Sequence, residues 1–136
     1  FQAIVKMDTQ DPPGGEKPVV DYLKQVLDAE GIPTQVFVKD APNRPNLVAR
    51  IKGNGKKRPL LIMGHQDVVS IDPTKWKDHG PFSADRDGGF IYGRGTIDDQ
   101  HKLAALERTI LCEVTPGRAL SDKEGGVDGR TRSEAP

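Results

Sequence analysis

A histidine and an aspartate separated by one residue could supply ligands for a divalent metal ion. His65 and Asp67 come shortly after the apolar run Leu60–Met63, and on an extended backbone their side chains would share one face. A second acidic group, Asp98–Asp99, stands where a helix is predicted to begin. Imidazole and carboxylate groups are common ligands of zinc and related ions. Spacing alone leaves open the alternative that His65 and Asp67 form an ordinary turn after a strand.

The other chemically versatile side chains receive structural interpretations. Cys112 is expected to be a small buried hydrophobe, because no Cys–His arrangement accompanies it. We expect His79 on the surface of a loop, and neither His79 nor His101 is favoured as a further ligand. Glu124 stands among glycines and charged residues with no apolar strand before it, so no catalytic role is favoured for it. Gly93–Gly95 is a turn and not a phosphate-binding loop, since no lysine and Ser/Thr follow in the required pattern.

The composition excludes several classes of protein. Lysine plus arginine and aspartate plus glutamate number 20 each among 136 residues, so the net charge of zero argues against a nucleic-acid-binding protein. No apolar run approaches the roughly 20 residues of a membrane helix, so no membrane partner is expected. A hydrophobic fraction of 35% predicts a modest core. The single cysteine slightly favours the cytoplasm and does not exclude secretion.

Two helices should flank the candidate metal ligands. Between residues 19 and 27 apolar side chains recur at helical spacing, and Gly31 with Pro33 ends that helix. A second helix is predicted from Asp98 onward, with apolar residues on one face. Asp98 could cap that helix as well as bind a metal, and Asp99 is expected to be a cap or first-turn residue.

Strands are predicted at Thr34–Lys39, Asn46–Lys52 and Phe90–Tyr92. Leu60–Met63 is a continuous apolar run between turns, which predicts a strand covered on both faces. The breaker-rich segment Asp11–Gly15 predicts a loop, and residues 68–87 a long irregular stretch.

These elements indicate an α/β fold with the candidate ligands at the carboxyl end of a buried strand, where open α/β sheets hold their sites. The pattern stops after Val114. Residues 115–136 are rich in glycine, serine and charge, which predicts an irregular or disordered tail.

Two ordered motifs resemble the zinc-dependent aminoacylase and exopeptidase superfamily. Leu60–Val69 reads LLIMGHQDVV, which is similar to an apolar run followed by GHxDVV. Later come Trp76, Pro81–Phe82 and then Asp87 to Asp99 with YGRG and an aspartate doublet. This superfamily includes acetylornithine deacetylase, succinyl-diaminopimelate desuccinylase, carboxypeptidase S and carnosinase-like dipeptidases. The resemblance covers residues 1–114, and Gln100 and His101 depart from its usual pattern.

The resemblance implies a role for each motif residue. His65 and Asp98 would be metal ligands, with Asp98 bridging two ions, and Asp67 would act in catalysis by orienting the His65 imidazole. The cofactor would be one or two Zn²⁺ ions, with Co²⁺ or Mn²⁺ as substitutes. The peptide bond between Asp98 and Asp99 would be cis. The fold would be part of a three-layer sandwich, a mixed sheet flanked by helices.

The family mechanism needs groups that residues 1–114 do not provide, namely a glutamate base and further ligands. We therefore expect residues 1–114 to be the amino-terminal half of a metallopeptidase catalytic domain in truncated form. The predicted function is hydrolysis of amide or peptide bonds in small peptides or N-acyl amino acids, with low or no activity of the chain alone. Alternatives are an inactive binding or assembly module and a metal-dependent esterase. Uncovered apolar faces would favour a homo-oligomer.

Overall fold

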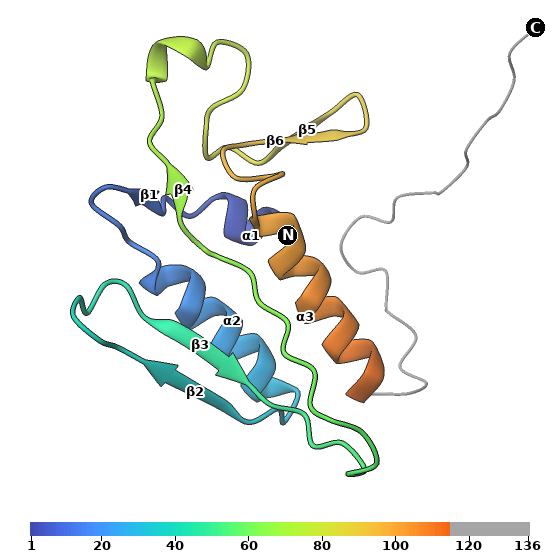
Figure 1. Ribbon diagram of the computed structural model, residues 1–136. Coiled ribbons are helices and arrows are strands. Elements are labelled where there is room, and N and C mark those ends of the chain that lie inside the picture. Colours follow the sequence, from blue (N-terminus) through green and yellow to red (C-terminus); the bar gives the residue numbers. More distant parts are fainter. Residues whose placement is uncertain (115–136) are drawn as a thin grey trace, which may run out of the picture.

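In this computed structural model the backbone is described for residues 1–114 and the side chains for residues 1–110 (Figure 1). The predicted tail 115–136, together with Glu124, lies outside the described residues. The side chain of Cys112 also lies outside them, so its expected burial stays a prediction.

The longest helices lie where the sequence places them. Helix α2 spans Lys17–Ala29 and buries the apolar positions at 19, 20, 23 and 27. It ends in a Schellman motif: Gly31 has a φ of +72°, its N–H donates to the Asp28 carbonyl, and the Ile32 N–H donates to the Leu27 carbonyl. Helix α3 spans Gln100–Val114 and so begins two residues later than Asp98. A short helix α1 (Gln2–Val5) and a 3-10 turn η1 (Pro73–Lys75) were not predicted.

The strands of the described residues form three separate two-stranded sheets. Strands β2 (Thr34–Phe37) and β3 (Asn46–Ala49) are antiparallel, which confirms both predicted strands at shorter length. Strands β5 (Asp85–Asp87) and β6 (Phe90–Tyr92) form a tight hairpin, and β1 (Gln10–Asp11) pairs in parallel with β4 (Val68–Val69). Helices combined with small sheets of both kinds fit the α/β class.

A small apolar core joins the three α-helices. Ile4 of α1 packs with Val19 and Leu23 of α2, all nearly inaccessible to solvent. Partly buried side chains from β3 and α3 pack against this cluster, among them Leu47 and Leu103. The core is as modest as the composition predicts, and it fixes α3 beside α2 (Figure 1). Within the part of the chain that the structure describes, no helix has both the length and the apolar character needed to cross a membrane.

The prediction for Leu60–Met63 is wrong. The segment is extended but forms no strand, and Leu60, Leu61 and Met63 are 83%, 76% and 77% exposed. A strand needs hydrogen-bonding neighbours, and among residues 1–114 the pairing along this segment begins only at Val68. The apolar side chains of this segment are suited to burial, but no element among the described residues covers them.

Two irregular regions contain more structure than predicted. Asp11 belongs to β1, because the backbone of β4 offers it a parallel partner at Val69. Asp85–Asp87 forms a strand within the stretch predicted to be irregular, because Gly88 and Gly89 both have positive φ and close a two-residue hairpin turn.

Candidate metal centre

The segment that carries His65 is held in place by hydrogen bonds to residues just after α1. The Val68 N–H donates to the Thr9 carbonyl at 3.0 Å, and the buried Thr9 hydroxyl donates to the Gln66 carbonyl at 2.7 Å. On the other side the segment passes close to α3: a Cβ built on Gly64 would lie 2.8 Å from Cδ2 of Leu103. Glycine at this position therefore lets the backbone before His65 approach the helix.

The turn that carries Asp98 is fixed at the start of α3. Gly95 has a φ of +80°, and its carbonyl accepts the Gln100 N–H at 3.1 Å. The peptide bond between Asp98 and Asp99 is cis, as the family resemblance implies. The Asp99 carbonyl accepts backbone N–H groups of the first helical turn, from Lys102 at 3.0 Å and from Leu103 at 3.3 Å, so Asp99 has the predicted cap position.

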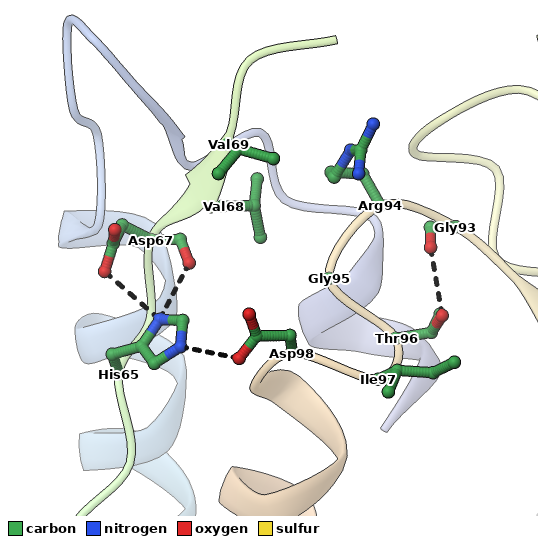
Figure 2. Close-up of a pocket in the computed structure, with 10 residues that line it drawn as sticks. All are labelled: His65, Asp67, Val68, Val69, Gly93, Arg94, Gly95, Thr96, Ile97 and Asp98. Atoms are coloured by element: carbon green, nitrogen blue, oxygen red, sulfur yellow. Dashed lines mark hydrogen bonds and ion pairs between the residues drawn. The ribbon is translucent and has the colours of Figure 1, made fainter. Parts of the chain in front are cut away.

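The structure brings His65, Asp67 and Asp98 together (Figure 2). The Nε2 atom of His65 lies 3.0 Å from Oδ1 of Asp98. The Nδ1 atom of the same ring lies 3.0 Å from the backbone carbonyl of Asp67 and 3.3 Å from its Oδ1. Each ring nitrogen thus faces an oxygen acceptor, so both can donate only when His65 is an imidazolium.

The surroundings of His65 stabilise its charged form. The hydrogen bond to Asp98 is the largest cause that raises the pKa of His65 above its ordinary value. Partial burial opposes this effect, and the Asp67 carbonyl and carboxylate add to it. When His65 is protonated, its Nε2 proton faces Oδ1 of Asp98.

The donor set fits a metal ion, but only in part. An Nδ1–H that donates to Asp67 leaves the Nε2 lone pair as the ligand atom, which is the usual way a neighbouring oxygen orients a metal-binding histidine. Nε2 and the Asp98 carboxylate then point at one shared position. Closed zinc sites usually have four ligands. Among the described residues no group of three or more His, Cys, Asp or Glu side chains is arranged to hold a metal.

The three residues line a pocket of about 290 Å³ between β4 and the turn before α3 (Figure 2). The lining is His65, Asp67, Val68, Val69, Gly93, Arg94, Gly95, Thr96, Ile97 and Asp98. Sequence reasoning treated Gly93–Gly95 as a turn alone and assigned no function to Arg94. The available signal was a cationic side chain between two glycines shortly before an aspartate doublet.

The remaining candidates lie outside this pocket. His79 was predicted to be exposed on a loop, but its side chain is only 23% exposed. Its ring stacks on Tyr92, with the ring centroids 4.0 Å apart. Its Nδ1 atom lies 3.2 Å from Asp85 Oδ2, and Asp85 is opposite Tyr92 in the hairpin register, which explains the stacking. His101 is exposed on α3. Asp99 is buried and pairs with Lys102 at 2.8 Å, and that ammonium group lowers the pKa of the Asp99 carboxyl.

Comparisons with known proteins find a family that part of this chain resembles. Residues 61–110 match the model of Peptidase family M20/M25/M40, a segment that includes His65, Asp67 and Asp98. This segment is similar to that metallopeptidase family, and each relative is matched over only part of its length.

Particular relatives are similar over most of the described residues. A succinyl-diaminopimelate desuccinylase of Methylorubrum extorquens is 34% identical over 109 residues, which is 77% of this chain and 27% of that protein. A probable succinyl-diaminopimelate desuccinylase of Staphylococcus aureus is 36% identical over 79% of this chain and 26% of that protein. The solved M20 family metallo-carboxypeptidase of Sulfolobus solfataricus has a TM-score of 0.69 and 30% identity over 81% of this chain and 25% of its own. The chain spans about a quarter of the length of these relatives.

Proposed function

We propose that this chain forms part of a metal-dependent hydrolase of amide or peptide bonds, acting on small peptides or N-acyl amino acids. One observation carries the proposal. His65 Nε2 and Asp98 Oδ1 lie 3.0 Å apart in the pocket lining. Asp67 lies on the opposite side of the imidazole ring, beside Nδ1. The desuccinylases and the metallo-carboxypeptidase named among the relatives act on bonds of this general type, which supports the proposal.

Each pocket residue has a distinct task in this proposal. His65 and Asp98 would hold one or two Zn²⁺ ions, and Co²⁺ or Mn²⁺ could use the same nitrogen and oxygen donors. When bound, the ion polarises a carbonyl and lowers the pKa of a water molecule. Asp67 keeps the His65 proton on Nδ1 and so keeps Nε2 free for the ion. Val68 and Val69 present apolar surface beside these groups.

The described residues would supply only half of the working site. Two protein ligands are fewer than a closed zinc site uses, and no general base is evident in the pocket lining. We propose that residues 1–114 are the amino-terminal half of a three-layer α/β catalytic domain. We also propose that the further ligands and the base come from chain beyond these residues. The 136-residue chain would then bind metal weakly and hydrolyse little alone, which favours an inactive binding module as the second candidate function.

Zinc titration by isothermal calorimetry tests the first step. Zinc uptake by the chain that is lost in His65→Ala supports the proposal. His101→Ala is the matched control, because His101 is an exposed histidine that does not line the pocket. Equal uptake in the chain and in His65→Ala would remove the basis for a metal centre here.

Hydrolysis assays then separate the candidate functions. N-acyl amino acids, dipeptides and a matched ester are offered to the zinc-loaded chain. Amide turnover that depends on His65 and Asp98 supports the hydrolase, and turnover of the ester alone supports an esterase. Zinc uptake without any turnover supports the binding module.

A further inference from the structure

Arg94 places a fixed positive charge on the wall of the metal pocket. Among the ten described residues that line the pocket, it is the one that stays cationic at every ordinary pH. Within residues 1–110 its guanidinium has no ion-pair partner. Its Nε atom is inaccessible to solvent and has no hydrogen-bond acceptor among the same residues. An arginine without an ion-pair partner can still bind an anion through the N–H groups of its two Nη atoms.

The position of Arg94 is set by the two glycines beside it. A Cβ on Gly93 would lie 2.4 Å from Cγ1 of Val5, and a Cβ on Gly95 would lie 2.4 Å from Cγ1 of Val68. The turn therefore lies tightly between α1 and β4, where a larger residue does not fit. The Arg94 N–H also donates to the Pro81 carbonyl at 2.7 Å, so the backbone that carries the guanidinium is fixed on both sides.

The side chain is held as well as the backbone. The Cζ atom of Arg94 lies 5.5 Å from the centroid of the Trp76 ring, within range for a cation–π contact. This contact uses one face of the planar guanidinium and none of its N–H donors. The edges carry the N–H donors that match the two oxygens of a carboxylate.

The distribution of charge in the pocket favours binding of an anion beside Arg94 rather than beside His65. Asp67 and Asp98 would repel a carboxylate at the His65 end unless a metal ion neutralises them. Figure 2 shows Arg94 on the turn across the pocket from the His65 segment, so attraction and repulsion act at different ends. An amide substrate with a free carboxylate could reach both ends at once.

We propose that Arg94 binds a carboxylate group of the ligand and so positions the neighbouring amide toward His65 and Asp98. The placement of the amide rests on the proposed hydrolase function, whereas carboxylate binding by Arg94 does not. Neutral amides and esters without a carboxylate would then be poor ligands of this pocket.

Trp76 reports on this contact directly, because it is the single tryptophan of the sequence. The whole chain is stripped of metal with a chelating resin and titrated with N-acetylglycine while tryptophan fluorescence is recorded. The neutral analogue N-acetylglycinamide is titrated in parallel. We expect a saturable change with the carboxylate and none with the amide.

Substitutions identify the residue responsible. Arg94→Gln should weaken N-acetylglycine binding about tenfold, and Arg94→Lys should retain part of it because the charge remains without the bidentate geometry. Arg86→Gln removes an exposed arginine of β5 outside the pocket lining and should change nothing. Saturation-transfer NMR on the acetyl methyl group gives the same affinities without using Trp76, whose signal Arg94→Gln alters by itself.

The outcomes separate this inference from the proposed function. If N-acetylglycine binds Arg94→Gln and the unchanged chain with equal affinity, the proposed role of Arg94 is overturned, regardless of the result of the zinc titration. An equal response to the neutral amide overturns it too. Carboxylate binding that depends on Arg94 in a chain that takes up no zinc supports the anion site and leaves the metal hydrolase without support.

Discussion

The Nε2 atom of His65 lies 3.0 Å from Oδ1 of Asp98, although the two residues are 33 positions apart in the chain. This contact joins the extended segment before β4 to the turn before α3. Both partners are about half exposed or more, with side-chain exposures of 47% and 84%. The packing of α3 on α2 and the pairing of β1 with β4 must therefore hold the two residues together, since an exposed ion pair contributes little by itself.

The pKa of His65 should respond to Asp98 in the metal-free chain. The pair raises this pKa above its ordinary value, so its contribution to stability is fully present below the unfolded-state pKa. That contribution is lost as the pH rises through the folded-state pKa. Asp98→Asn should lower the His65 pKa, as followed by NMR titration of the ring. Asp85→Asn alters the carboxylate beside His79 and is the control, which should leave the His65 titration unchanged.

Replacing Asp67 should weaken zinc binding less than replacing His65. Groups that orient a metal-binding histidine typically change metal affinity by about 10–100-fold. The Asp67 backbone carbonyl accepts from Nδ1 and survives Asp67→Ala, so we expect a loss near the lower limit, roughly tenfold. Calorimetric zinc titration measures the change. A loss as complete as that of His65→Ala would show that the Asp67 carboxylate is itself a ligand.

Local sequence patterns predicted the parts of this fold that depend on near neighbours. The helical stripe of Val19, Leu23 and Leu27 gave both the extent of α2 and its buried face, because periodicity fixes which side chains point inward. The proximity of His65 to Asp98 was not available from spacing. It followed from the order of the two motifs, which carries long-range information that periodicity lacks.

The predictions that were wrong or missing share one physical cause: each depends on contacts between residues far apart in the sequence. Whether Leu60–Met63 is covered depends on which elements lie beside it, and no run of apolar residues encodes that. The stacking of His79 on Tyr92 depends on the β5–β6 register, which places Asp85 opposite Tyr92. The exposure of Arg94 to the pocket likewise depends on how the turn packs between α1 and β4.

Gly95→Ala should destabilise the chain by about 1–3 kcal/mol. The substitution forces a side chain into a left-handed backbone conformation and places its Cβ 2.4 Å from Val68. Gly53→Ala is the control, because Gly53 has no positive φ and a Cβ added there would meet nothing within 4 Å beyond its chain neighbours. This control should change stability by less than about 0.5 kcal/mol. Urea unfolding measures both. Similar midpoints would mean that the turn beside Arg94 adjusts freely.

Gln100→Met should stabilise the chain. Gln100 is fully buried, and neither its Oε1 nor its Nε2 has a hydrogen-bond partner among the described residues. A buried polar group without partners costs about 1–3 kcal/mol, which a methionine of similar length avoids. Thermal unfolding should therefore show a higher midpoint for the variant. A lower midpoint would mean that the amide has a partner in solution, such as a bound water molecule.

The exposed apolar segment Leu60–Met63 should drive self-association of the 136-residue chain. Leu60 and Met63 are the two most exposed residues of this segment, and burying one large apolar side chain contributes about 1.5–3 kcal/mol. We expect a concentration-dependent rise in mass in sedimentation velocity, consistent with a homo-oligomer. Leu60→Lys combined with Met63→Lys should weaken association roughly tenfold or more, since two buried side chains are lost. Phe90→Lys is the matched control, because Phe90 is 67% exposed on β6 and lies outside this segment. If the control dissociates the oligomer and the double variant does not, the contact lies at the hairpin instead.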